Sequence, residues 1–399
     1  MSKAHTPTRV GGDKPEDFLN LSSLLSTEEQ QIVATVRRFV KDRILAEVGQ
    51  WYDEGTFPAR DLAPVMGELG LLGMHLDGYG CAGMSAVDYG LACLELEAGD
   101  SGLRSFVSVQ GSLAMFPIWA YGSEEQKERW LPAMAAGDAI GCFGLTEPDA
   151  GSDPSSMRTR AVQEPSGDWI LNGTKMWITN GSIADVAVVW AQTERGIRGF
   201  VVPTDTPGFS SNAIMAKASL RASVTSELVF SDLRLPADAV LPDVVGMKGP
   251  LSCLNEARFG ILFGAVGAGR ACYEAALTYA KEREQFGGPI ARFQLTQQKL
   301  VEMMVGVNQS QLLALHLGRL KDQGDISSAQ VSFGKMHNVR AALEIARSAR
   351  SVLGANGITL EYPVIRHMNN LESVYTYEGT HEIHTLVLGQ AITGSGAFS

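Results

Sequence analysis

A short segment near the C-terminus has residue types suited to proton transfer. Tyr377, Glu378, Gly379, Thr380 and His381 stand directly before the apolar stretch EIHTLVLG. A glutamate at this place can simply favour the positive end of a helix dipole. It can also act as a general base, because a carboxylate enclosed in an apolar pocket has a raised pKa and can remove a weakly acidic proton from carbon. The residue types alone leave both interpretations of Glu378 open.

Two segments in the middle of the chain carry groups suited to a flat, polar ligand. The stretch FGLTEPDAGSDPSS, residues 143–156, leaves a predicted strand and is dense in hydroxyls, acids and turn residues. It predicts either a surface turn or a loop that donates hydrogen bonds to a cofactor. Trp177, Ile178 and Thr179 end a second predicted strand. This indole can pack in the core, or it can cover a flat ring while the threonine bonds to the edge of the ring.

Two turns in the last third of the chain can likewise be either structural or part of a ligand site. REQFGGPIARFQ sets Arg283, Phe286 and Gln294 around a Gly-Pro turn between two predicted helices. The turn can be simply solvated, or its guanidinium can meet a pyrophosphate. SVLGANGI, residues 351–358, is a helix end in which the glycines can cap the helix or let the backbone approach a ligand.

The elements that must position these groups fall into three blocks. Capping boxes begin a helix at Ser26 or Thr27. Apolar periodicity predicts helices near 27–44, 61–73, 86–98, 104–120, 123–134, 251–284, 293–323, 328–353 and 380–392, with short β-branched runs from 140 to 241. We therefore expect a helical domain with an N-terminal arm at 1–139, a central β domain at 140–246 and a helical domain at 247–399. Residues 1–20 are expected to be poorly ordered.

Composition narrows the class of protein. The chain has 399 residues with 33 Lys plus Arg against 44 Asp plus Glu, and the net charge of -11 argues against nucleic acid or an anionic membrane as the main partner. The five cysteines have neither CxxC nor Cys/His spacing, so no metal site and no disulfide framework are expected. The first residues lack the apolar region of a secretory signal, and no apolar run reaches membrane-spanning length. We expect a globular, cytoplasmic protein.

Taken together and in this order, LTEPDAGSD, WITN, REQFG with a downstream Gln, LGANG and YEGTH resemble the acyl-CoA dehydrogenase family from about residue 20 to the end. The resemblance implies an α+β multidomain fold with an N-terminal helical domain, a central β barrel-like domain and a C-terminal four-helix bundle. It also implies a homotetramer that holds FAD at a contact between subunits.

The resemblance further implies which residues bind FAD. The residues expected to line the flavin are Phe143, Leu145, Thr146, Gly151, Ser152, Trp177, Ile178 and Thr179. The residues expected to reach the adenosine diphosphate part, from the neighbouring subunit, are Arg283, Phe286 and Gln294, with Ser351, Leu353, Gly354 and Ala355 close by. Thr380 and Glu382 would complete the site. Ala355 stands where the family more usually has a second glycine.

For the reaction, the resemblance implies that Glu378 removes the α-proton of an acyl-CoA while a β-hydride passes to the flavin. The segments 95–112 and 254–258 resemble the glutaryl-CoA branch of the family. In that branch Arg104 would hold the distal carboxylate of the substrate, because a buried arginine is costly unless an anion pairs with it. The other residues expected to contact substrate are Glu97, Ser105, Ser108, Ser152, Leu254, Asn255, Arg258 and Gly379.

The expected activity is therefore oxidation of glutaryl-CoA with decarboxylation to crotonyl-CoA and carbon dioxide, and electron transfer flavoprotein as the acceptor. Three alternatives stay open. They are a glutaryl-CoA dehydrogenase that does not decarboxylate, a short-chain acyl-CoA dehydrogenase, and a non-catalytic flavin- or CoA-binding protein. Arg104 argues against a short neutral substrate, and Glu378 argues against a non-catalytic protein.

Overall fold

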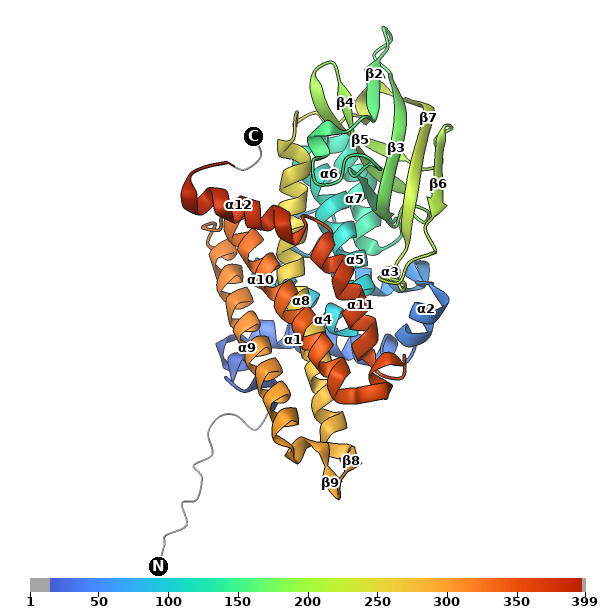
Figure 1. Ribbon diagram of the computed structural model, residues 1–399. Coiled ribbons are helices and arrows are strands. Elements are labelled where there is room, and N and C mark those ends of the chain that lie inside the picture. Colours follow the sequence, from blue (N-terminus) through green and yellow to red (C-terminus); the bar gives the residue numbers. More distant parts are fainter. Residues whose placement is uncertain (1–14, 397–399) are drawn as a thin grey trace, which may run out of the picture.

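The computed structural model describes residues 15–396 and shows a helical part, a sheet and a second helical part in chain order (Figure 1). Most of the expected N-terminal arm lies outside the described residues. Pro15–Asp17 (η1) and Leu21–Leu24 (η2) form 3-10 turns, and the amide of Leu19 donates to Asn308 Oδ1 at 3.1 Å. The prediction of a poorly ordered arm is therefore wrong for residues 15–20, which lie against helix α9 (Gln294–Asp322).

The N-terminal helices follow the predicted pattern with local differences. They are α1 (Thr27–Arg43), α2 (Val48–Glu54), α3 (Ala59–Glu68), α4 (Ala86–Gly99), α5 (Ser101–Ser108), the π-helix η3 (Val109–Met115), α6 (Phe116–Tyr121) and α7 (Glu124–Ala136). The predicted capping box at Ser26 is present, with Glu29 as its partner. Helix α2 was not predicted. The helix expected to run to residue 73 ends at Glu68, since Gly70 has a φ of 68° and turns the chain.

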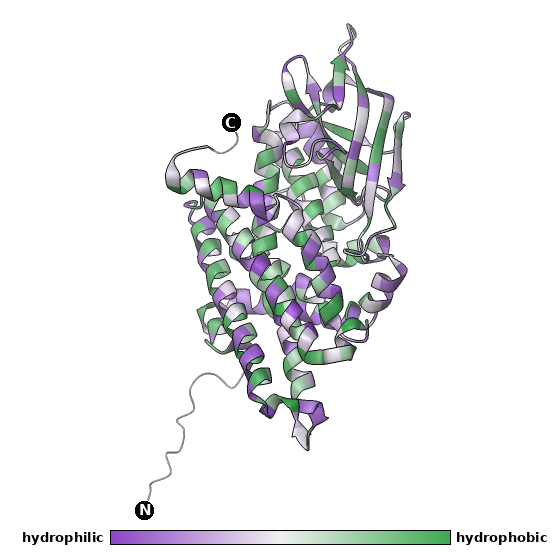
Figure 2. Ribbon diagram, viewed as in Figure 1, coloured by the Kyte–Doolittle hydropathy of each residue, from purple (hydrophilic) through white to green (hydrophobic). Residues whose placement is uncertain are grey.

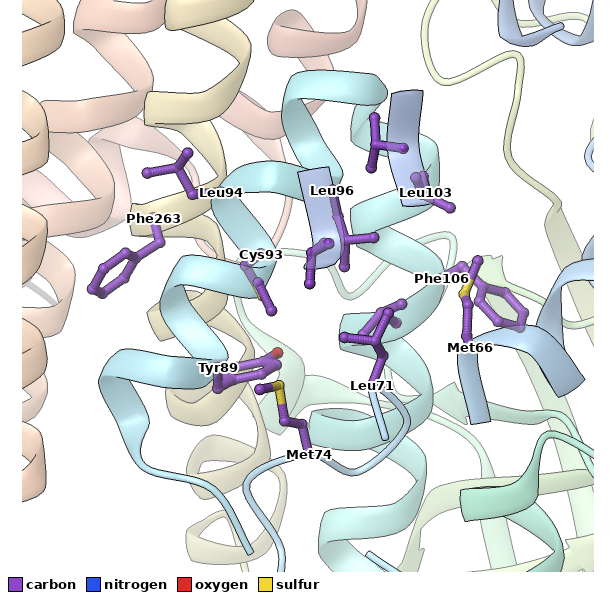
Figure 3. Packing of buried hydrophobic residues seen from close by; sticks show 14 of the residues in the cluster. Met66, Leu71, Met74, Tyr89, Cys93, Leu94, Leu96, Leu103, Phe106 and Phe263 are labelled. Atoms are coloured by element: carbon purple, nitrogen blue, oxygen red, sulfur yellow. The ribbon is translucent and has the colours of Figure 1, made fainter. Parts of the chain in front are cut away.

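Helix α4 lies in the centre of the molecule. Nearly all of its residues are buried, as expected for a helix covered on every side. Figure 3 shows its side chains meeting residues from α3, α5 and α8 (Lys248–Glu282); the labelled members include Met66, Tyr89, Cys93, Leu96, Phe106 and Phe263. This packing joins the N-terminal helices directly to the C-terminal ones.

The sheet is built from seven strands. They are β1 (Gly141–Gly144), β2 (Arg160–Gln163), β3 (Trp169–Thr179), β4 (Val186–Thr193), β5 (Gly196–Pro203), β6 (Phe209–Ala213) and β7 (Thr225–Leu235). The order is β1-β4-β2-β3-β7-β6, and β5 pairs with β4. The register of β3 against β7 shifts between Lys175 and Ile178, and such an irregularity changes the direction in which a side chain points.

Four helices form the C-terminal bundle, namely α8, α9, α10 (Ser328–Leu353) and α11 (Pro363–Thr376). Helix α12 (His381–Thr393) lies at the end of the bundle nearest the sheet, and the hairpin of β8 (Glu284–Gln285) and β9 (Gly288–Pro289) lies at the opposite end (Figure 1). The bundle helices carry hydrophobic and hydrophilic residues in alternation around their axes (Figure 2). Helix α11 was not predicted. In residues 15–396 no helix is both long and apolar enough to cross a membrane.

One buried carboxylate joins all three parts of the molecule. Asp100 lies between α4 and α5, and its Oδ1 accepts a hydrogen bond from the amide of Gly102 at 2.6 Å. Its Oδ2 accepts from Asn370 Nδ2 at 2.8 Å and from the Arg366 guanidinium, both on α11. The Asn370 Oδ1 in turn accepts from the amide of Leu220, in the segment between β6 and β7. Asp100 thus fixes α5 and α11 relative to each other.

The contact between α8 and α4 leaves no room for a side chain at Gly267. A Cβ atom there would lie 1.9 Å from the carbonyl oxygen of Leu94. We expect Gly267→Ala to lower the free energy of unfolding by about 1–3 kcal/mol or more, because the two helices must separate. Gly49→Ala is the matched control, since a Cβ on α2 would make an ordinary contact of 3.5 Å with Leu360. Thermal unfolding measures both, and equal losses would contradict the close packing.

Candidate active site

Glu378 lies in a tight reversal between two helices. It follows Tyr377, the C-cap of α11, and precedes Thr380, the N-cap of α12. Glu378 has a φ of 53° and Gly379 a φ of 94°, so both residues are in the left-handed region. A Cβ atom at Gly379 would lie 2.9 Å from His384 Nε2, which excludes any larger residue there. The carboxylate is therefore held in a backbone conformation that a glutamate rarely adopts.

The environment of Glu378 favours proton uptake. Among the described residues its Oε2 is buried and has no hydrogen-bond partner. Burial raises the pKa of Glu378, and the positive charges of Arg104, Lys335 and Arg258 partly offset this effect. A carboxylate with a raised pKa and a free oxygen atom suits general-base chemistry.

A guanidinium group lies at the other end of this cluster. Arg104, on α5, is fully buried, and its Nε donates to Glu97 Oε2 at 2.7 Å. Its Nη2 donates to the hydroxyl of Tyr377, and Ser105 Oγ lies 3.3 Å from the same hydroxyl. Its Nη1 is buried with no hydrogen-bond partner among residues 15–396. Tyr377 thus connects Arg104 to the loop that carries Glu378.

Helix α8 contributes a second arginine. The Nε of Arg258 donates to the carbonyl oxygen of Glu378 at 2.7 Å. Leu254 and Asn255 lie about one turn earlier on α8, and Asn255 Oδ1 is a buried atom without a partner in the described part of the chain. Ser108 is buried one turn after Arg104 on α5, whereas Ser152 is exposed. Direct contacts therefore unite Glu97, Arg104, Ser105 and Arg258 with the Glu378 loop.

The loop after β1 and the end of β3 carry the expected flavin contacts and lie against each other. The amide of Met176 donates to the carbonyl of Thr146 at 2.9 Å, which holds the loop against β3. Trp177, with a φ of 64°, lies where the register of β3 shifts, and its side chain is 60% exposed. An exposed indole followed by Thr179 suits a flat ring with polar edges.

The residues expected to contact the flavin differ in which of their atoms can reach a ligand. Phe143, Leu145 and Ile178 have buried side chains that belong to the core, so only their backbone atoms can face a ligand. Gly151 has open space around it. The hydroxyl of Thr380 accepts from the amide of Ile383 at 3.2 Å and caps α12. Glu382 is exposed in the first turn of the same helix.

A second group of expected FAD contacts lies at the far end of the bundle. Arg283, Phe286 and Gln294 are exposed at the β8–β9 tip (Figure 1). Ser351 lies at this end too, because its Oγ accepts from Lys299 Nζ on α9 at 2.8 Å. Residues 258 and 283 are separated by 25 positions along α8, and a rise of about 1.5 Å per residue puts them roughly 37 Å apart. One chain therefore does not bring its two groups of expected FAD contacts together.

The helix end at residues 351–355 accommodates its unusual alanine. Gly354 has a φ of 59° and takes the left-handed position, with open space around it. Ala355 is exposed in the 3-10 turn η7 (Gly354–Ile358), whereas Leu353 is buried in the bundle core. The glycine that the backbone needs is present, so Ala355 causes no strain here.

Two buried lysines of this region, Lys335 and Lys175, were not predicted. Lys335, on α10, donates to carbonyl oxygens of the Glu378 loop. Lys175, on β3, donates to the carbonyl of Leu145 at 2.9 Å and to Glu147 Oε1 at 2.8 Å, and so holds the loop after β1. The sequence did contain a signal for Lys335, which replaces an apolar residue in the buried row that includes Val331 and Val339.

Comparison with known proteins agrees with this arrangement. Three family models match the chain in order: the acyl-CoA dehydrogenase N-terminal domain at residues 26–138, the middle domain at 142–233 and the C-terminal domain at 245–393. The human short-chain specific acyl-CoA dehydrogenase, mitochondrial, is 36% identical over 372 residues, which cover 91% of this chain and 90% of that protein. The chain belongs to the acyl-CoA dehydrogenase family. The predicted family and fold class are thereby confirmed.

Two solved structures are more similar still. A crystal structure of glutaryl-CoA dehydrogenase from Mycobacterium smegmatis is 66% identical, with a TM-score of 0.95, and the match covers 96% of this chain and 99% of that one. A second glutaryl-CoA dehydrogenase from the same organism, in complex with FADH2, is 61% identical, with a TM-score of 0.95 and the same coverage of both chains.

Proposed function

We propose that the protein is an FAD-dependent glutaryl-CoA dehydrogenase that also decarboxylates its product to crotonyl-CoA. The observation that carries this proposal is the pair of buried atoms without a partner in the described part of the chain, Arg104 Nη1 and Glu378 Oε2. One is a hydrogen-bond donor on a cation and the other an acceptor on a base, and Tyr377 lies between their residues. A substrate with an acidic α-carbon and a distal carboxylate satisfies both.

The substrate's second carboxylate explains the burial of Arg104. The Nε and Nη2 atoms of Arg104 donate hydrogen bonds to Glu97 and Tyr377, whereas Nη1 has no acceptor in the described part of the chain. A buried donor without an acceptor costs about 1–3 kcal/mol, more on a charged group. The distal carboxylate of glutaryl-CoA provides that acceptor, whereas the methyl end of butyryl-CoA does not. Arg104 thus selects for a dicarboxylic acyl group.

The residues around Trp177 fit the isoalloxazine ring of FAD, since the exposed indole offers a flat apolar face and Thr179 a polar edge. When bound, FAD supplies the acceptor for the β-hydride. The protein's own residues then handle the proton. Glu378 Oε2 takes the α-proton, and the Glu378 amide donates to the thioester oxygen, where negative charge develops.

Decarboxylation follows from the same two groups. After oxidation the bond between the γ-carbon and the distal carboxylate breaks, carbon dioxide leaves, and the electron pair spreads over a dienolate conjugated to the thioester. Glu378, now protonated, returns its proton to the γ-carbon and gives crotonyl-CoA. The presence of Glu97 and Ser108 beside Arg104 supports this outcome, since both are buried near the distal carboxylate.

The proposed assembly is a homotetramer in which the β8–β9 tip of one subunit completes the FAD site of another. The roughly 37 Å along α8 between Arg258 and Arg283 supports it. The bundle and α12 also expose large apolar side chains suited to a subunit contact; they are Leu295, Val301, Val305, Leu312 and Phe333 on the bundle and Ile392 on α12. We further propose electron transfer flavoprotein as electron acceptor and the cytoplasm as the site of action.

Product analysis tests the reaction. We expect mass spectrometry to find crotonyl-CoA after the purified protein is incubated with glutaryl-CoA and an artificial electron acceptor. Glutaconyl-CoA would keep the substrate and exclude the decarboxylation. Unchanged glutaryl-CoA beside a reacting butyryl-CoA control would contradict the proposed substrate.

Replacement of the base tests the role of Glu378. We expect Glu378→Gln to retain FAD, because the replacement keeps the size of the side chain, and to lose reduction of the flavin by glutaryl-CoA. Stopped-flow absorbance of the flavin measures the rate. A rate near that of the unchanged protein would rule out Glu378 as the base.

Replacement of the distal arginine tests substrate choice. We expect Arg104→Ala to raise the KM for glutaryl-CoA about tenfold to a hundredfold, since a charge-assisted contact contributes roughly 1.5–3 kcal/mol. The KM for butyryl-CoA serves as the control for general damage, because the variant also leaves Glu97 without its ion pair. Equal increases for both substrates would make Arg104 a purely structural residue.

A further inference from the structure

Three successive carbonyl groups around the base accept hydrogen bonds from buried cations. Lys335 Nζ donates to the carbonyl of Tyr377 at 3.0 Å and to that of Gly379 at 2.8 Å. Arg258 Nε donates to the carbonyl between them, that of Glu378, at 2.7 Å. The two cations come from α10 and α8, so two helices of the bundle hold one turn of backbone.

This turn needs such support. Glu378 and Gly379 both have positive φ, and a non-glycine residue in the left-handed region costs on the order of 1–3 kcal/mol unless its surroundings hold it there. With Lys335 bound to the carbonyls on either side of Glu378, the peptide groups before and after the base cannot rotate freely. Lys335 and Arg258 therefore hold the backbone from which the Glu378 side chain extends.

The burial of the Lys335 ammonium group is unfavourable, and the group lies against the loop that carries the base. Its side chain is 1% exposed, and both of its hydrogen bonds go to neutral carbonyl oxygens. A neutral side chain at this position of α10 would avoid the loss of hydration that a buried ammonium group suffers. The positive charge at this position also acts on the carboxylate of Glu378, whose pKa it lowers.

We propose that Lys335 is a positioning residue for the base: it holds the left-handed turn at Glu378 and supplies positive charge that favours the ionised carboxylate. This inference rests on the proposed role of Glu378 and deepens it. Lys335 touches neither the substrate nor the reacting atoms, so its effect on the reaction passes through Glu378.

The charges around the two groups give the sign of the effect. The charges that change the pKa of Lys335 are those of Glu378, Arg258, Arg104 and Glu382. The charge of Glu97, on α4, changes the pKa of Glu378. The charge of Lys335 in turn lowers the pKa of His384. The pKa of Lys335 is lowered to about 7, chiefly by burial, and the charge of Glu378 partly offsets this lowering. Burial raises the pKa of Glu378, and the charge of Lys335 lowers it. Loss of the Lys335 charge therefore raises the pKa of Glu378.

The experiment follows flavin reduction in the FAD-loaded protein at saturating acyl-CoA over a range of pH. The rate requires ionised Glu378, so it rises with pH through the pKa of that group. We expect Lys335→Met to lower the rate at neutral pH about ten- to a hundredfold, with a smaller change in KM, and to shift the rising limb to higher pH. Lys335→Arg keeps the charge and is expected to keep the limb near its original position.

Lys217→Met is the matched control. Lys217 is also largely buried and donates to the carbonyls of Leu220 and Ser223 and to Thr225 Oγ1, and burial lowers its pKa to about 8. Its removal is expected to lower thermal stability without moving the pH profile. If Lys335→Met lowers stability in the same way and its pH profile coincides with that of the unchanged protein, Lys335 is structural and the inference is overturned.

A second variant and a choice of substrate keep the test of Lys335 informative even if Lys335→Met does not retain FAD or glutaryl-CoA is not a substrate. Lys335→Gln retains a donor for the carbonyls but no charge, so it replaces Lys335→Met if that variant does not retain FAD, and the same shift of the limb is expected. The unchanged protein is first tried with glutaryl-CoA and butyryl-CoA, and the variants are compared on whichever thioester reduces its flavin. Failure of glutaryl-CoA alone thus rejects the proposed substrate, whereas an unmoved pH limb rejects the role of Lys335.

Discussion

The relative position of α5 and α11 is set by the buried carboxylate of Asp100. Arg104 lies one turn after Asp100 on α5, and α11, which holds the same carboxylate through Arg366 and Asn370, ends just before Glu378. Two regular helices therefore determine how far the guanidinium lies from the base. Loss of one partner from such a buried charge costs about 3–5 kcal/mol, so this spacing is strongly held. Only the reversal at residues 377–380 lies outside these two helices.

The interior holds several other charges, and their pairing separates structural from chemical roles. Glu95 accepts two hydrogen bonds from Arg270 and two from Arg37. Burial raises the pKa of Glu95, but the two arginines outweigh burial and lower this pKa to about 2. Glu147 is bound by Lys175 and by two backbone amides, so it organises a loop. At Arg104 and Glu378, by contrast, a guanidinium nitrogen and a carboxylate oxygen are buried without a partner among residues 15–396. The saturated pairs stabilise the fold, whereas the unpaired atoms of Arg104 and Glu378 can each form one more hydrogen bond.

Local signals made much of this molecule predictable. The capping box at Ser26 marked a helix start, and the ordered motifs identified the family. Helix α11 escaped prediction because its buried side carries Arg366, His367 and Asn370, which break the apolar period. The bond between Arg104 and Tyr377 joins residues 273 positions apart, and no local pattern contains such a contact. Lys335 is intermediate: its place in an apolar row was visible, but its carbonyl partners were not.

The length of α8 has a consequence for mixtures of defective chains. Under the proposed assembly, a chain without Glu378 still lends an intact β8–β9 tip to its neighbour, and a chain without Arg283 still carries its own base. A hybrid oligomer built from these two inactive chains contains some complete sites. Two alleles that each encode an inactive chain can therefore complement one another in one cell. Conversely, a variant of the tip exerts its defect on a neighbouring chain, which makes such a variant partly dominant.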